Sequence, residues 1–141
     1  DYAETFLEAA GVAIPDDMQG RSLVPLLKGQ SPKEWRDSIY YHYYEYPGYH
    51  WVRRHYGVAD GRYKLIRFYE QDVDQWELFD LKTDPKEMKS VYGQPGLAKV
   101  QKRLTKQLAM HRKQLEVPKE DPPHSVVNRL PPRVRKPTKP N

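Results

Sequence analysis

The chain contains no cysteine in its 141 residues, so this stretch forms no disulfide, holds no metal through thiolates and has no cysteine nucleophile. It also lacks an apolar run of the roughly 18 to 20 residues that a membrane-spanning helix needs, and it begins without a basic-then-apolar signal. Because the chain opens at Asp1 rather than at a methionine, we interpret it as a piece of a longer protein, in which a missing signal says nothing about export.

The length allows one modest domain with a single core. The net charge of +5 is concentrated near the end, because residues 119–141 contain six Lys or Arg against two acids. The remainder is close to neutral, so the charge does not indicate a nucleic-acid partner. Seven prolines follow Val117, and this composition predicts a disordered Pro-rich basic tail over residues 118–141.

The most distinctive feature that is present is the stretch of residues 40–58. It holds seven of the 11 tyrosines, three of the five histidines, Trp51 and the pair Arg53-Arg54. A core strand does not need this mixture, since every hydroxyl, imidazole and guanidinium requires a polar partner or water. Aromatic faces stack on sugars, and Arg and His donate to sulfate or phosphate oxygens. The stretch therefore indicates a surface that binds a sugar or an anion.

Two short helices are expected at the start of the chain. Asp1 is the expected N-cap of the first, with Glu4 completing a capping box and Gly11 ending the helix. Ser22 is the expected cap of a second helix that ends at Gly29.

Strands are expected next, because the chain becomes rich in β-branched and aromatic residues. The expected strands cover residues 39–46, 56–59, 62–69 and 75–81. Asp60-Gly61 predicts a two-residue hairpin turn with positive φ at both positions. Apolar residues at steps of three and four from Leu97 to Leu115 then predict a helix that lies against the sheet. The fold class is α+β: a small antiparallel sheet of three to four strands, packed by a C-terminal helix and preceded by short helices.

Four segments together resemble the C-terminal region of type I sulfatases, the formylglycine-dependent, arylsulfatase-like enzymes. They are D-Y-A-E-T-F-L-E-A-A-G at residues 1–11, M-Q-G-R-S-L-V-P-L-L-K-G at 18–29, H-Y-G-V through R-Y-K-L-I at 55–66, and W-E-L-F-D-L-K-T-D-P-K-E at 76–87. The segment Y-H-Y-Y-E-Y-P at 41–47 is similar to members that act on sulfated sugars, including sulfoglucosamine hydrolases. Ala59 stands where many members carry Arg.

The resemblance implies a sulfatase parent protein that hydrolyses sulfate esters or sulfamates of carbohydrates. Its formylglycine and Ca²⁺ sites would lie upstream, because no C/S-x-P/A-x-R motif and no matching carboxylate cluster occur here. We expect no catalytic residue, no metal ligand and no cofactor in this fragment, which would be inactive alone. Its expected partners are the N-terminal catalytic domain and a sulfated carbohydrate, and the family suggests a periplasmic, secreted or lysosomal location.

The resemblance also divides the chain into three parts. Residues 1–30 would be the helical end of the N-terminal domain, 31–117 the C-terminal subdomain, and 118–141 the tail. The candidate substrate-binding residues are five side chains of the aromatic stretch and its end: His42, His50, Arg53, Arg54 and His55. The alternative is a stand-alone, non-catalytic module that binds glycans or another partner.

Overall fold

The computed structural model describes residues 1–46, 51–70 and 72–121, and the statements below refer to these residues. By its contacts the chain divides into two compact units, Asp1–Asp37 and a second that begins at Ser38. Each unit is described by itself.

The first unit contains helices α1 (Tyr2–Ala9) and α2 (Val24–Leu27). Two side chains of α1 hold the connection between them. The amide of Gly20 donates to Glu4 Oε1 at 2.8 Å, and the amide of Leu23 donates to Thr5 Oγ1 at 2.9 Å. A Cβ at position 20 would collide with the Glu4 carboxylate, so this close approach requires glycine.

Only one half of the predicted capping box of α1 is confirmed: the amino group of Asp1 lies 2.8 Å from Glu4 Oε2. Asp1 occupies the N-cap position but makes no side-chain bond to the helix, because its Oδ1 accepts from the amide of Arg21 at 2.9 Å instead. The predicted cap of the second helix is displaced by one residue. Leu23 occupies the N-cap position of α2 without a side-chain cap bond, and Ser22, just before it, accepts at Oγ from the amide of Val24 at 3.2 Å.

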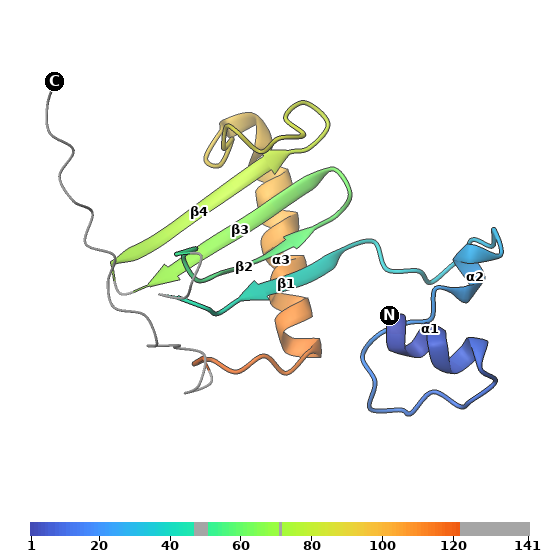
Figure 1. Cartoon of the computed structure of the whole chain (residues 1–141). Helices are drawn as coiled ribbons and strands as arrows, with labels where there is room; N and C mark the ends of the chain where they lie inside the picture. Colours follow the sequence, from blue (N-terminus) through green and yellow to red (C-terminus); the bar gives the residue numbers. More distant parts are fainter. Residues whose placement is uncertain (47–50, 71, 122–141) are drawn as a thin grey trace, which may run out of the picture. The chain divides into compact units, whose positions relative to one another are not determined.

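The second unit is built on a four-stranded antiparallel sheet with the order β1-β2-β3-β4 (Figure 1). The strands are β1 (Ile39–Tyr43), β2 (His55–Ala59), β3 (Tyr63–Glu70) and β4 (Val73–Asp80). Each strand pairs with the next one along the chain, so the sheet is a meander whose pairing needs only local connections.

The β2–β3 turn differs from the prediction. Of its residues, Gly61 has a positive φ of +84°, whereas Asp60 is not in the left-handed region. Asp60 Oδ1 instead accepts from the amides of Arg62 and Tyr63, at 3.1 and 2.7 Å. The turn is therefore held by an aspartate side chain, and glycine is at its first central position, as in a type II′ turn.

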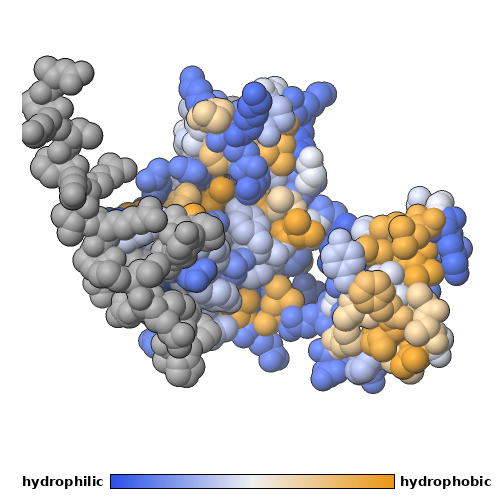
Figure 2. Space-filling model, in the orientation of Figure 1, coloured by the Kyte–Doolittle hydropathy of each residue, from blue (hydrophilic) through white to orange (hydrophobic). Residues whose placement is uncertain are grey.

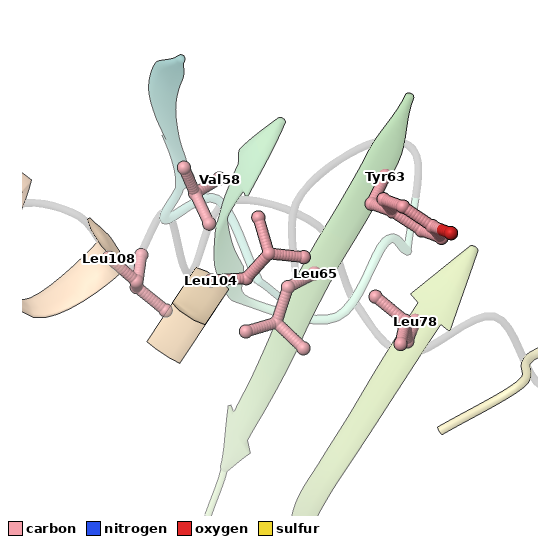
Figure 3. Packing of buried hydrophobic residues seen from close by; sticks show 6 residues of the cluster. All are labelled: Val58, Tyr63, Leu65, Leu78, Leu104 and Leu108. Carbon is pink, nitrogen blue, oxygen red and sulfur yellow. The ribbon is translucent and has the colours of Figure 1, made fainter. Parts of the chain in front are cut away.

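One face of the sheet carries the core. Helix α3 (Ala98–Gln114), which follows the 3₁₀ turn η1 (Pro95–Leu97), crosses this face (Figure 1). Strand and helix residues meet there in a cluster of buried side chains (Figure 3): Val58, Tyr63, Leu65, Leu78, Leu104 and Leu108. Successive strand residues point to opposite faces, so Val58, Leu65 and Leu78, which are cross-strand neighbours, all reach the helix.

The α+β prediction is confirmed: four antiparallel strands, a packed C-terminal helix and short helices before them. Among the described helices, none has the length and apolar character needed to cross a bilayer. Of the predicted tail, residues 122–141 lie outside the described residues, whereas residues 118–121 are described and contribute to the site below.

Candidate functional site

The aromatic stretch is divided between the two faces of the sheet by the alternation of its strands. His42 of β1 is opposite Tyr56 of β2, which is opposite Arg67 of β3, and this row lies on the face covered by α3. Tyr43 is opposite His55, which is opposite Phe68, and this row lies on the other face. Neighbouring residues in the sequence therefore have different surroundings.

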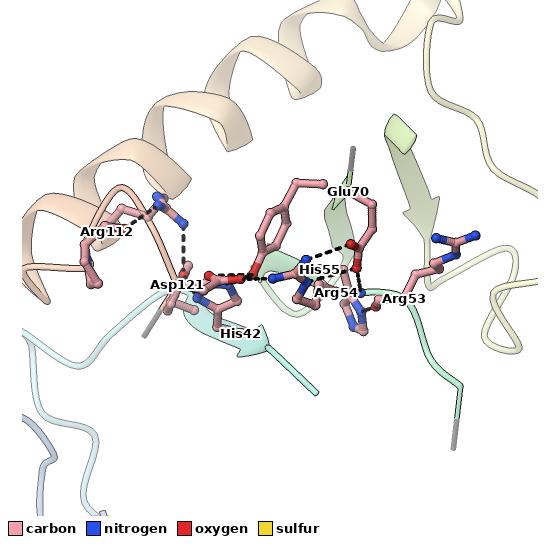
Figure 4. A network of polar contacts seen from close by, with 10 residues as sticks. His42, Arg53, Arg54, His55, Glu70, Arg112 and Asp121 are labelled. Carbon is pink, nitrogen blue, oxygen red and sulfur yellow. Dashed lines mark hydrogen bonds and ion pairs between the residues drawn. The ribbon is translucent and has the colours of Figure 1, made fainter. Parts of the chain in front are cut away.

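His42 is at the centre of a network of polar contacts at one end of the α3 face (Figure 4). Its side chain is 6% exposed. Nδ1 lies 2.9 Å from the Tyr40 hydroxyl, and Nε2 lies 2.5 Å from the Tyr69 hydroxyl. The ring of Tyr44 lies against the imidazole, with 3.9 Å between the ring centroids. Both ring nitrogens are thus engaged within the protein.

Burial determines the charge of this histidine. Removal from water lowers the pKa of His42 to about 4, against a smaller opposing effect of the Asp121 carboxylate. The ring is therefore neutral near pH 7. Burial, followed by the bond to Asp121, also raises the pKa of the Tyr69 hydroxyl, which stays protonated and donates to that carboxylate at 3.0 Å.

Arg54 joins this network to the start of β2. Its Nε and Nη2 donate to the two oxygens of Glu70, at 3.0 and 2.8 Å, and its Nη1 donates to Asp121 at 2.9 Å. The Glu70 side chain is only 6% exposed, and the bonds from Arg54 hold the pKa of its carboxyl below the usual range. Each buried carboxylate thus has a cationic partner.

The end of α3 closes the network on its other side. The Arg112 guanidinium lies 4.2 Å from the centroid of Tyr56 and donates to the Tyr40 hydroxyl at 3.3 Å. It also donates to the carbonyl of Pro118 at 3.3 Å, so that the chain after α3 returns toward the sheet and places Asp121 beside Arg54. The network thus joins three parts of the chain that are distant in sequence: β1, the adjacent ends of β2 and β3, and the end of α3 with the residues that follow it.

Arg53 has different surroundings from Arg54, and Figure 4 shows it directed away from Asp121. Its two terminal nitrogens donate to the two oxygens of Asp72, each at 3.0 Å. Its guanidinium carbon lies 4.6 Å from the centroid of the Tyr46 ring. The Asp72 side chain is 64% exposed, so this ion pair lies in water at the surface.

His55 lies on the face opposite to His42. Its ring stacks on Tyr43 at a centroid distance of 5.6 Å and an interplanar angle of 21°, and Nδ1 lies 2.7 Å from the carbonyl oxygen of Arg53. His50 is outside the described residues. The structure therefore brings His42 and Arg54 into one network and places Arg53 and His55 outside it, while a substrate role for all five stays a prediction.

In residues 1–46, 51–70 and 72–121, no three His, Cys, Asp or Glu side chains come together as a metal ion would require. The described residues therefore do not fit the Ca²⁺ that the family implies for the parent protein.

The acidic residues of the network, Glu70 and Asp121, were not among the residues predicted from the sequence. Glu70 follows a regular strand pattern, and Asp121 falls in a segment whose prolines predict a tail. The available signal was an unusual excess of cations and hydroxyls in residues 40–58, which had to be matched by acids from elsewhere in the chain.

Comparison with known proteins places this arrangement in a family. The sequence profile of the family "N-sulphoglucosamine sulphohydrolase, C-terminal" matches residues 1–114. An N-acetylglucosamine-6-O-sulfatase of Bacteroides thetaiotaomicron is 46% identical over 129 residues, which is 90% of this chain and 23% of that protein. Arylsulfatase K of Xenopus laevis is 37% identical over 98 residues, 67% of this chain and 18% of that protein.

Solved structures agree with these sequence matches. A protein solved in complex with its substrate D-glucosamine-2-N,6-O-disulfate has a TM-score of 0.78 and 48% identity, and the match covers 82% of this chain and 24% of that one. A 2-O GAG sulfatase has a TM-score of 0.72 and 25% identity, covering 83% of this chain and 25% of that one. The chain thus spans about a quarter of the length of these relatives. It belongs to the family of N-sulphoglucosamine sulphohydrolase C-terminal regions.

Proposed function

We propose that this chain is the C-terminal part of a carbohydrate sulfatase, a hydrolase that removes sulfate groups from sugars. The observation that carries the proposal is the 46% identity to an N-acetylglucosamine-6-O-sulfatase across 90% of the chain. A match of this extent includes the strands and connections that carry the candidate site, so it bears on the substrate as well as on the fold.

The proposed substrate class is a glucosamine unit that carries a 6-O-sulfate. Two relatives support it: the sulfatase named above, and the protein solved with D-glucosamine-2-N,6-O-disulfate, which is 48% identical to this chain. The aromatic and cationic side chains of residues 40–58 suit such a ligand, because it offers an apolar ring face and an anion.

The first unit has the surface expected of a segment that belongs to a larger domain. Phe6 and Leu27 are 69% and 76% exposed, and Figure 2 shows hydrophobic residues gathered on this unit. A contiguous apolar surface of this kind marks an interface. We place residues 1–30 at the end of the catalytic domain, as the upstream part of the parent protein would cover these side chains.

The C-terminal subdomain, residues 31–117, supplies structural cover and one wall of the substrate cleft. In this proposal Arg53 contacts the substrate, while His42 and Arg54 hold the end of β1 and the residues just before β2 in place through their buried contacts. His55 supports Arg53 through its contact with the carbonyl of that residue. His50 remains a candidate contact on sequence grounds.

The chemistry belongs to the part of the protein upstream. Formylglycine and Ca²⁺ would be supplied there, and residues 1–141 alone would have no sulfatase activity. The same family assignment supports an exported location for the parent protein, periplasmic, secreted or lysosomal.

The direct test is to read the coding sequence upstream of Asp1 and to express the longer protein. We expect an in-frame C/S-x-P/A-x-R motif, and release of sulfate from N-acetylglucosamine 6-sulfate by the longer protein but not by residues 1–141. A stop codon immediately upstream, or a longer protein without sulfatase activity, would overturn the proposal.

A further inference from the structure

A second group of side chains lies at the β1–β2 connection, outside the buried network. We call Tyr46, Trp51 and Arg53 the aromatic platform. The ring centroids of Tyr46 and Trp51 are 6.3 Å apart at an interplanar angle of 81°, and the guanidinium of Arg53 lies over Tyr46. Trp51 is 40% exposed, and the Arg53 side chain is 37% exposed. Two aromatic rings and a cation thus share one accessible surface.

The partner of Arg53 shows what else this cation can bind. Asp72 accepts from both terminal nitrogens of Arg53, which is the forked geometry that a guanidinium also offers to two oxygens of a sulfate. An ion pair between exposed side chains contributes little to stability. An incoming anion can therefore replace the Asp72 carboxylate at little cost.

The backbone at Trp51 supports a functional role for the platform. Its φ of +55° lies in the left-handed region, which is unfavourable for a bulky residue and is typical of ligand-binding positions. This residue is 40% exposed, and its indole contacts the ring of Tyr46.

We propose that the aromatic platform is a subsite for a sulfated sugar ring, in which Arg53 exchanges Asp72 for the sulfate and the aromatic rings contact the sugar. The substrate class rests on the proposed function, whereas the position of the subsite rests on the contacts described here. In this proposal Asp72 occupies the position on Arg53 that the sulfate would take, and competes weakly with it.

The chain contains a matched control for this arrangement. Arg67 pairs with the exposed Asp74 and lies 5.3 Å from the ring centroid of Trp76. It also donates to the Tyr56 hydroxyl, and Trp76 is stacked on Tyr92 at an interplanar angle of 10°. This arginine has the same kinds of partner, but it has an additional hydroxyl contact and its indole face is stacked on another ring.

The test is a titration of the 141-residue chain followed by heteronuclear NMR, with the Trp51 indole N–H and the Arg53 side-chain N–H as reporters. The ligands are N-acetylglucosamine 6-sulfate, N-acetylglucosamine and sodium sulfate. We expect the sulfated sugar to shift both reporters and to bind more tightly than either control ligand. Arg53→Gln should weaken binding about tenfold, as the loss of a charge-assisted pair predicts.

Two further variants test whether Asp72 competes with the ligand and whether the effect is specific to Arg53. Asp72→Asn should tighten binding about threefold, because it removes the competing carboxylate, and Arg67→Gln should leave binding unchanged. Shifts confined to residues outside the platform, equal binding of sodium sulfate, weaker binding in Asp72→Asn, or no shift at tens of millimolar ligand would each overturn it.

These results are separable from the proposed function. If the longer protein releases sulfate while the reporters do not respond, the platform is wrong and the sulfatase assignment stands. If the reporters respond while the longer protein is inactive, the platform is a glycan-binding site without chemistry.

Discussion

His42 has hydrogen-bond partners that specify one protonation state. Tyr69 donates its proton to Asp121, so the Tyr69 oxygen is left to accept from Nε2–H of His42. Arg112 donates to the Tyr40 oxygen, so Tyr40 donates its own proton to Nδ1. A neutral ring with its proton on Nε2 satisfies every contact, whereas a second proton on Nδ1 would face the Tyr40 hydroxyl hydrogen.

This arrangement predicts that the chain loses stability in mild acid. The folded-state pKa of His42, about 4, lies below its ordinary value of 6.5, so between these values the unfolded chain binds a proton that the folded chain does not. The stabilisation is complete above about pH 6.5 and is lost as the pH falls toward 4, by about 1 to 3 kcal/mol in total. Urea unfolding at pH 7 and pH 5 measures it. In His42→Gln the pH dependence should be shallower, and an identical slope in both proteins would contradict the argument.

The two adjacent arginines should differ in what they contribute to folding. Arg54→Gln leaves the buried Glu70 and the partly buried Asp121 without their cation, so it should lower the free energy of unfolding by about 2 to 4 kcal/mol. Arg53→Gln is the matched control and should change it by less than about 1 kcal/mol, since its ion pair is exposed. Urea denaturation of both variants provides the comparison. Equal losses of unfolding free energy would contradict a structural role for Arg54 and a ligand-binding role for Arg53.

At the residue scale, the sequence indicated the region that contains the polar network, but not the contacts that each residue makes there. The composition of residues 40–58 was sufficient to select the region. The division of roles between Arg53 and Arg54 depends on Asp72, Glu70 and Asp121, and no local pattern links these acids to the two arginines. Roles that depend on contacts across the fold cannot be predicted from a single segment.

Among the elements, β2 depends on one residue without a side chain. A Cβ at Gly57 would collide with the carbonyl oxygen of Leu65 and with the phenol ring of Tyr41, which lies across the strand at this point. The close approach lets Tyr41 cover the face of the sheet opposite to α3. Burial raises the pKa of the Tyr41 hydroxyl, in keeping with this position.

Gly57→Ala should therefore destabilise the sheet despite the higher strand propensity of alanine. Shifting Tyr41 and the β2–β3 ladder should cost about 1 to 3 kcal/mol, as overpacked sites do. Gly96→Ala is the control, because a Cβ there meets nothing within 4 Å, and it should be close to neutral. Thermal unfolding of both variants provides the measurement. A neutral Gly57→Ala would show that Tyr41 can move away freely.

Strands and the terminal helix could be predicted because their apolar residues repeat with the correct period. Leu104 and Leu108 follow the helical repeat and are buried, and Leu65 and Leu78 follow the strand repeat. The β2–β3 turn was predicted less well. Asp-Gly fits a turn with positive φ at both residues, but the Asp60 side chain instead accepts two backbone bonds, and this choice is decided by geometry rather than by composition.

At the scale of the whole molecule, the two units differ in whether they bury hydrophobic side chains. Every buried hydrophobic side chain of the described residues lies between Val58 and Leu108, in the second unit. The buried residues of the first unit are Glu4 and Thr5, which hold its backbone turns rather than form an apolar core. The second unit thus carries the apolar burial that drives folding, and the first does not.

A shortened chain of residues 38–121 should therefore fold and keep the melting temperature of the whole chain within about 3 °C, since it retains the whole core and the Asp121 contacts. Residues 38–118 should melt lower, because they lack Asp121, the second anionic partner of Arg54.

In the 141-residue chain, backbone amides of residues 2–29 should exchange with solvent faster than those of β2 and β3. Differential scanning calorimetry and hydrogen exchange test these outcomes. Loss of the folded state in residues 38–121, or strong amide protection in α1, would show that the first unit contributes to the stability of this chain and would contradict its assignment to an upstream domain.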